Sequence, residues 1–150
     1  MSGKNPVLPP VYFWGAVAAL AALGFLLPGP RFLEWPWRWI GLPFVLFGLH
    51  LNLAADGAFK KAGTTVKPFE KSSALLTGGV FRISRHPMYL GMTAVLLGGA
   101  LLFGGMIPLL PAILFSFLME SRFIGAEERM MEESFGEEWR AYTAKTRRWV

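Results

Sequence analysis

The chain has 150 residues, of which 53% are hydrophobic, and its mean hydropathy is +0.42. This composition excludes an ordinary soluble domain and is typical of a membrane protein. The net charge of +5 does not indicate a nucleic-acid partner, because the basic residues are distributed as in a multi-pass membrane protein. Cysteine is absent, which excludes disulfides, thiolate metal sites and a cysteine nucleophile. With only two histidines as well, we predict no metal site.

Apolar stretches long enough to cross a bilayer occur at about residues 11–27, 36–55, 87–103 and 106–124. The first is expected to be retained as a span, because it lacks both a strongly basic start and a small-residue cleavage site. The segment FGGM at residues 103–106 makes the last two spans a tight hairpin. We therefore expect an all-α integral membrane protein with about four transmembrane helices, forming a single domain over residues 1–150.

The charges predict the orientation of these spans. With four spans, the N-terminus, the loop at residues 56–85 and the C-terminal tail share one side, and the other side keeps only Arg31 and Arg38 of the 15 basic residues. By the positive-inside tendency, both termini are cytosolic. Tryptophans at positions 35, 37 and 39 suit an aromatic belt at the outer interface. We expect a multi-pass protein of a prokaryotic inner membrane.

The C-terminal tail, residues 122–150, is expected to form a cytosolic amphipathic helix, since Met131, Phe135, Trp139 and Tyr142 recur at helical spacing. The simpler interpretation is a helix that lies at the lipid headgroups. However, the tail begins with EERMMEE, and its four carboxylates are a poor anchor for an anionic leaflet. They are better suited to a cationic ligand.

The segment SRHPMYLG at residues 84–91 lies at the mouth of the third span. Proline is favoured at the first helical position, so Arg85 and His86 are predicted to lie at the cytosolic N-terminus of that helix, where anions are favoured. The arginine fork can hold a carboxylate. Tyr89 and Gly91 follow in the next turn, and the glycine permits close approach of a backbone or of a flat ligand. Snorkelling by Arg85 and helix packing by Gly91 are the alternative readings.

The hairpin brings Arg85 and His86 within reach of Glu127 and Glu128, because one span begins and the next ends on the same side. A ligand with both anionic and cationic groups matches this set, and S-adenosylmethionine is such a ligand. Adjacent helical residues point about 100° apart. We expect Glu128 to be the inward-facing member of the pair.

The segments GTTVKPF, LLTGGVFRISRHPMYLG and EERMMEESFGEEWRAY resemble, in order and spacing, the integral-membrane methyltransferases, which include isoprenylcysteine carboxyl methyltransferases and phospholipid N-methyltransferases. The family pattern is RHPxYxG at one helix start and EExxL…FGxxYxxY beyond the next span. The residues that match it are Arg85, His86, Pro87, Tyr89, Gly91, Glu127, Glu128, Phe135, Gly136 and Tyr142. Met131 and Trp139 depart from the pattern but keep bulk and apolarity.

The resemblance implies methyl transfer from S-adenosylmethionine, at the cytosolic face, to a lipid-like acceptor that enters from the bilayer. The acceptor is either of the isoprenylcysteine carboxylate type, on a prenylated small molecule or peptide, or of the phospholipid amine type. The cofactor-binding half covers about residues 63–149. Expected catalytic residues are Arg85, His86 and Glu128. Expected cofactor contacts are these three with Tyr89, Gly91, Glu127 and Tyr142.

Polar residues within the second span are functional candidates, because burying them in a membrane is costly. We assign substrate binding to His50 and Asn52, together with Leu53 and Met92. A lateral gap lined by residues such as Leu49, Leu53, Met92 and Leu96 is expected to admit the acceptor. Two other functions stay open: a non-enzymatic membrane adaptor that docks through its tail, and a nicotinamide enzyme similar to the sterol reductases.

Overall fold

The computed structural model describes residues 7–65, 70 and 72–150. Apart from an isolated β-bridge between Arg31 and Gly105, the regular structure of this part is helical, as predicted. The elements are α1 (Pro9–Leu26), the 3₁₀ turn η1 (Trp37–Ile40), α2 (Gly41–Ala62), the 3₁₀ turn η2 (Gly79–Arg82), α3 (Pro87–Phe103), α4 (Leu109–Met119), the π-helical turn η3 (Glu120–Ile124), α5 (Gly125–Phe135) and α6 (Glu137–Thr143).

Within the described residues, three helical segments are long and apolar enough to cross a membrane: Pro9–Leu26, Trp37–Ala62 and Leu109–Phe135. The apolar helix α3 is shorter, with 17 residues, and its bounds are those predicted for the third span. Pro87 begins it and Gly104, at φ 74°, ends it in the left-handed conformation that glycine favours. The last span differs from the prediction, because α4, η3 and α5 continue one another well beyond residue 124.

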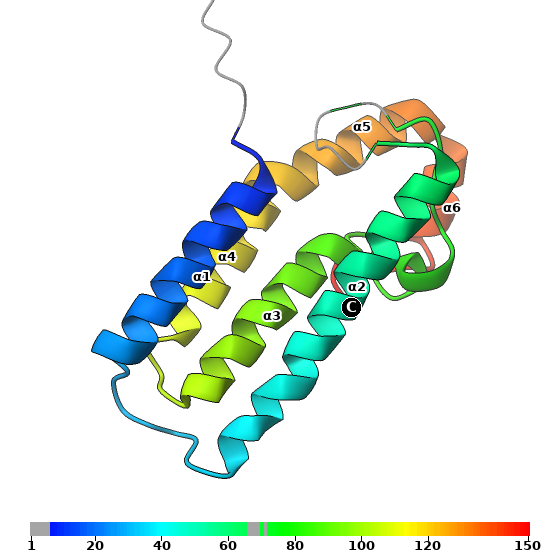
Figure 1. Cartoon of the computed structure of the whole chain (residues 1–150). Helices are drawn as coiled ribbons and strands as arrows, with labels where there is room; N and C mark the ends of the chain where they lie inside the picture. Colours follow the sequence, from blue (N-terminus) through cyan, green and yellow to red (C-terminus); the bar gives the residue numbers. More distant parts are fainter. Residues whose placement is uncertain (1–6, 66–69, 71) are drawn as a thin grey trace, which may run out of the picture.

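The long helices α1 to α4 lie side by side, and α5 and α6 extend over one end of the bundle (Figure 1). Helix α3 packs against α1, α2 and α4, whereas α2 packs mainly on α3. The opposite end carries the short connections between α1 and α2 and between α3 and α4 (Figure 1). Trp35, Trp37 and Trp39 are all exposed there. Helices α3 and α4 are joined at this end by a short connection and pack against each other.

Helices α2 and α3 meet through glycines that bring the two backbones into contact. A Cβ atom on Gly48 would lie 2.3 Å from the Gly91 carbonyl oxygen, and one on Gly41 would lie 2.3 Å from that of Gly98. Asn52 lies against Gly91 at this contact, and its Nδ2 donates within α2 to the Gly48 carbonyl at 2.9 Å. Small residues at such a crossing permit close packing in a membrane, where no hydrophobic effect drives helices together.

We expect Gly48→Val to destabilise the protein by about 1–3 kcal/mol, because the added side chain must push α3 away. Thermal unfolding in detergent, followed by circular dichroism, measures the loss. Gly57→Val is the matched control: it lies on the same helix, and a Cβ atom there meets nothing within 4 Å. Equal unfolding temperatures for the two variants would contradict the backbone contact as a source of stability.

The tail is not the single amphipathic helix that was predicted over residues 122–150. Helix α5 continues directly from the last long span, and Gly136, at φ 49° and ψ −114°, breaks the helix after Phe135. Only glycine adopts such a conformation without strain. Helix α6 then turns away and ends at Thr143, and the chain beyond it returns to the start of α3, where the Arg85 amide donates to the Arg147 carbonyl at 3.0 Å.

Candidate functional site

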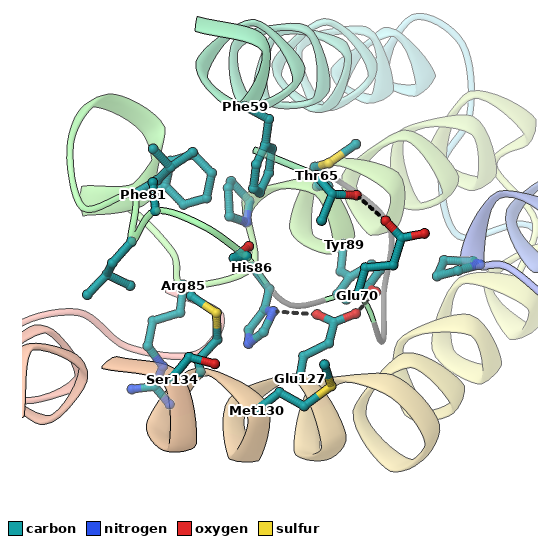
Figure 2. Close-up of a pocket in the computed structure, with 18 of the residues that line it drawn as sticks. Phe59, Thr65, Glu70, Phe81, Arg85, His86, Tyr89, Glu127, Met130 and Ser134 are labelled. Carbon is teal, nitrogen blue, oxygen red and sulfur yellow. Dashed lines mark hydrogen bonds and ion pairs between the residues drawn. The ribbon is translucent and has the colours of Figure 1, made fainter. Parts of the chain in front are cut away.

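A cavity of about 350 Å³ lies where α3 begins, between the starts of α1 and α3, the end of α2, the loop before α3, and the helices α5 and α6. Its walls are largely apolar. The larger apolar side chains that line it are Leu8, Phe59, Leu75, Leu76, Phe81, Met88, Met92, Met130, Met131 and Trp139. Phe59 on α2 and Glu127 on α5 reach it from opposite sides in Figure 2. Small-molecule sites have this size and this mixture of apolar walls with a few polar groups.

The polar side chains of the cavity centre on Glu127. Because Pro87 begins α3, His86 lies directly before the helix and Tyr89 in its first turn, and α5 crosses opposite them. The Tyr89 hydroxyl donates to Glu127 Oε1, and His86 Nδ1 lies 3.4 Å from Glu127 Oε2. The His86 and Tyr89 rings stack, with centroids 5.8 Å apart. The Glu127 carboxylate is therefore held at the cavity wall from two sides.

Glu128, the next residue, lies outside the cavity lining and has different partners. Arg85 donates to its Oε1 from Nε at 3.0 Å and from Nη2 at 2.8 Å. Arg148 donates to both carboxylate oxygens. His86 Nε2 lies 3.3 Å from Oε1, so the ring stands between the two glutamates. The choice of Glu128 as the inward-facing residue was wrong, because Glu128 pairs with Arg85 and Arg148 and Glu127 is the one that lines the cavity.

The predicted convergence of Arg85 with the acidic helix is confirmed by its 2.8 Å contact with Glu128. The guanidinium fork of Arg85, however, binds a carboxylate of the protein itself, that of Glu128. Its remaining Nη1 donates to the carbonyls of Thr146 at 2.9 Å and Thr143 at 3.5 Å, and the guanidinium lies 5.9 Å from the centre of the Trp139 ring. Arg85 thus joins the start of α3, α5 and the C-terminal segment at one point.

Of the other expected cofactor contacts, Tyr142 lines the cavity and Gly91 does not. The Tyr142 hydroxyl donates to the Phe81 carbonyl at 2.6 Å, which fixes α6 against the loop before α3. Gly91 lies at the contact with α2, where an added Cβ atom would meet Asn52 Nδ2 at 2.2 Å. Helix packing accounts for this glycine.

Among the residues assigned to the substrate, Met92 lines the cavity, whereas His50, Asn52 and Leu53 do not. The buried face of α2 carries Gly48, Leu51 and Ala55, so His50 and Leu53 point outward, and Leu53 is 73% exposed. Leu96 is buried in the core shared by α1, α3 and α4. The expected lateral gap between Leu49 or Leu53 and Met92 is therefore wrong: the glycine contact closes α2 against α3.

Sequence reasoning missed the residues that support Glu128 from the C-terminal side. Arg148 counted only as one of the basic residues of the tail, yet it bridges Glu128 and Glu120. The Trp149 indole donates to Glu120 Oε2 at 2.8 Å, and the buried Ser84 hydroxyl donates to the Arg148 carbonyl at 2.8 Å. One signal was available: Glu120 is a carboxylate within an apolar span, and such groups usually have a partner.

The environment of His86 predicts a pH-dependent stability. Burial alone would lower the pKa of His86, but its hydrogen bonds with Glu127 and Glu128 outweigh burial and raise that pKa above 6.5. A pKa that is raised on folding stabilises the protein fully below the unfolded value, and this stabilisation is lost as the pH rises through the folded value.

We therefore expect the unfolding temperature of the wild-type protein to fall as the pH rises above 6.5. His86→Gln should remove this fall, because the amide does not titrate. His50→Gln, at an exposed position of α2, should retain it. Thermal unfolding in detergent across this pH range is the measurement, and an identical slope in wild type and His86→Gln would contradict the prediction.

Comparison with known proteins agrees with the motif resemblance. The family model described as phospholipid methyltransferase matches residues 37–138. The chain belongs to the phospholipid methyltransferase family. An uncharacterized protein of Haemophilus influenzae is 36% identical over 63 residues, which is 42% of this chain and 100% of that protein.

The fold of this phospholipid methyltransferase family member is also similar to a solved structure. That structure is the eukaryotic intramembrane Ras methyltransferase, isoprenylcysteine carboxyl methyltransferase. The match has a TM-score of 0.69 at 20% identity and covers 100% of this chain but 53% of that enzyme, so the chain spans about half its length. At this identity the likeness concerns the fold. Family and fold together indicate a membrane methyltransferase.

Proposed function

We propose that the chain transfers a methyl group from S-adenosylmethionine to a lipid-like acceptor, on the side of the membrane that carries both termini. The observation that carries this proposal is the Glu127 carboxylate, held by His86 and Tyr89 at the wall of a largely apolar cavity beside the membrane helices. Four spans with both termini in the cytosol belong to the proposal. The 17 residues of α3 lie within the tolerated range of about 17–25 for a span.

The residues of the cavity fit S-adenosylmethionine. Glu127 can accept hydrogen bonds from an ammonium or from ribose hydroxyls. The aromatic and methionine side chains on the other walls, such as Phe59, Phe81 and Met130, suit a flat heteroaromatic base. The volume of about 350 Å³ falls in the range of about 300–1,000 Å³ that is usual for small-molecule sites. When bound, the cofactor supplies a methyl group on a sulfonium that is already strongly electrophilic.

The protein then has to position the reactants and exclude water. Different residues of the site perform these two tasks. Glu127, His86 and Tyr89 bind and orient the polar part of the cofactor. Arg85 and Glu128 act by fixing α5 and the C-terminal segment against the start of α3. The apolar walls exclude water from the reacting atoms. A positioned pair of reactants gains much of its rate from orientation alone.

The charges of the cavity favour an amine-type acceptor. Glu127 and Glu70 both line it, and the lining arginine, Arg85, is already paired with Glu128. Such a lining attracts a cationic headgroup more strongly than an anionic one. A protonated amine must lose its proton before it accepts a methyl group, and Glu127 or the neutral form of His86 can receive it.

Equilibrium binding of S-adenosylmethionine to purified protein in lipid nanodiscs tests the proposal, followed by transfer of a radiolabelled methyl group to vesicles. One vesicle set contains phosphatidylethanolamine, and a second contains a prenylated cysteine peptide. We expect cofactor binding and a labelled phospholipid, with a rate that rises with pH through neutrality. A membrane adaptor would bind no S-adenosylmethionine, so absence of binding by the folded wild-type protein would overturn the proposal.

Met92→Trp is expected to block acceptor turnover by at least about tenfold while cofactor affinity changes little. Met92 lines the cavity one turn deeper in the membrane than Tyr89, where the acyl part of an acceptor would enter. Leu53→Trp is the matched control, because Leu53 is exposed and lies outside the lining. Methyl transfer to vesicles is the measurement, and equal rates in both variants would exclude entry past Met92.

A further inference from the structure

The C-terminal segment, residues 144–150, is fixed to the rest of the protein through both backbone and side chains. The Arg147 carbonyl accepts from the Arg85 amide at 3.0 Å, and the Arg148 carbonyl accepts from the Ser84 hydroxyl at 2.8 Å. Thr146 is buried, and the Trp149 indole donates to Glu120. These contacts place the Arg148 side chain between Glu120 and Glu128.

Arg148 is the group that binds Oε2 of Glu128. Its Nη2 donates to Oε2, and its Nε donates to Oε1 at 3.1 Å, while Nη1 binds Glu120. Arg85 donates both of its hydrogen bonds with Glu128 to Oε1, the oxygen that also faces His86. Arg148, Glu120 and Trp149 do not line the cavity. The Arg148 side chain therefore reaches the site through Glu128.

We propose that Arg148 is a positioning residue that orients the Glu128 carboxylate so that Oε1 meets His86, which in turn holds Glu127 at the cavity wall. An arginine paired alone with a carboxylate prefers two parallel hydrogen bonds, one to each oxygen. Without Arg148, the carboxylate of Glu128 is free to rotate into that pairing with Arg85. Oε1 would then leave His86, and the ring would lose one of the two carboxylates that fix it.

The titration of His86 reports this rotation. The charged and titratable groups around the ring are Glu127 and Glu128 from α5, Tyr89 from α3, Arg85 beside it in sequence, and Arg148 behind Glu128. Removal of a nearby cation by itself raises the pKa of a histidine, whereas loss of a carboxylate partner lowers it. The two possible roles of Arg148, fixed charge or positioning, therefore shift the titration in opposite directions.

The first test uses nuclear magnetic resonance of protein with labelled histidine rings. The chain has two histidines, and His50→Gln assigns their signals. We expect the titration midpoint of His86 to fall in Arg148→Gln and to recover in part in Arg148→Lys, which restores the charge without the fork. Arg147→Gln is the matched control, since it removes the same charge from an exposed neighbour. A midpoint that rises or stays constant in Arg148→Gln would overturn the positioning role.

The second test is cofactor affinity, which rests on the proposed function. Arg148→Gln should weaken S-adenosylmethionine binding about tenfold, and Arg147→Gln should leave it within about twofold. Leu20→Ala, in the core away from the cavity, controls for a general loss of stability. Binding by Arg148→Gln as tight as in wild type, or as in Leu20→Ala at equal unfolding temperature, would overturn the inference. Wild-type protein that binds no cofactor would overturn the proposed function instead, and the His86 titration would still decide the role of Arg148.

Discussion

Glu127→Gln is expected to weaken S-adenosylmethionine binding by tens-fold or more and to reduce methyl transfer at least as much. Glu127 is the carboxylate of α5 that lines the cavity, and its neighbours His86 and Tyr89 hold it at the cavity wall. Loss of one partner of a desolvated charged contact typically costs about 2–5 kcal/mol. Glutamine keeps the volume and one acceptor oxygen, so the loss measures the charge rather than the packing.

Isothermal titration of nanodisc protein with S-adenosylmethionine is the measurement for Glu127→Gln. Glu133→Gln is the control, because Glu133 lies on the same helix, α5, but is exposed and outside the cavity lining. We expect that control to bind like wild type. Similar affinities for the two variants would mean that the cofactor does not meet Glu127.

Arg85→Met should have the largest effect on stability, about 3–5 kcal/mol, because it leaves the partly buried Glu128 carboxylate with one arginine fewer. The Arg85 and Glu128 side chains are only 13% and 14% exposed. The substitution also removes the donor to the Thr146 carbonyl and the contact with the Trp139 ring. Methionine preserves much of the apolar stem, so the loss is chiefly that of the guanidinium.

Chemical or thermal unfolding in detergent measures this loss, and cofactor affinity is determined on the same samples. Arg82→Met is the matched control at an exposed position three residues earlier. In the double variant Arg85→Met/Glu128→Gln, the combined loss should be smaller than the sum of the two single losses, because each single variant already loses the contact between the two side chains. Strict additivity would show that the pair does not interact. An unchanged stability of Arg85→Met would contradict the role of Arg85 in fixing α5 and the C-terminal segment against the start of α3.

Several parts of the fold could be predicted because they depend on local sequence. The bounds of α3 follow from Pro87 and Gly104, whose backbone preferences begin and end a helix whatever lies around it. The apolar stretches predict the long helices, and FGGM predicts the hairpin. The hairpin in turn predicted that Arg85 and Glu128, 43 residues apart in sequence, lie close together. The structure places them in hydrogen-bond contact.

Which residues of the site contact Glu127 and which contact Glu128 depended on the tertiary structure. Adjacent glutamates on one helix are equivalent by composition, and what separates Glu127 from Glu128 is which neighbours each one meets. Tyr89 and His86 meet the first, and Arg85 and Arg148 meet the second. Arg148 comes to Glu128 because Gly136 breaks the tail and the chain folds back onto Ser84, 64 residues earlier in sequence.

The sequence by itself therefore determined the family, the helices and the set of charged residues that gather at one end of the bundle. Only the tertiary structure decided which of those residues face the cavity and which hold the others in place. Gly91 and Asn52 turned out to pack against each other where α3 meets α2, while the Asn52 amide donates within its own helix to Gly48. The physical reason is that helix formation and hydropathy depend on near neighbours, whereas the orientation of a side chain depends on contacts between residues far apart in the chain.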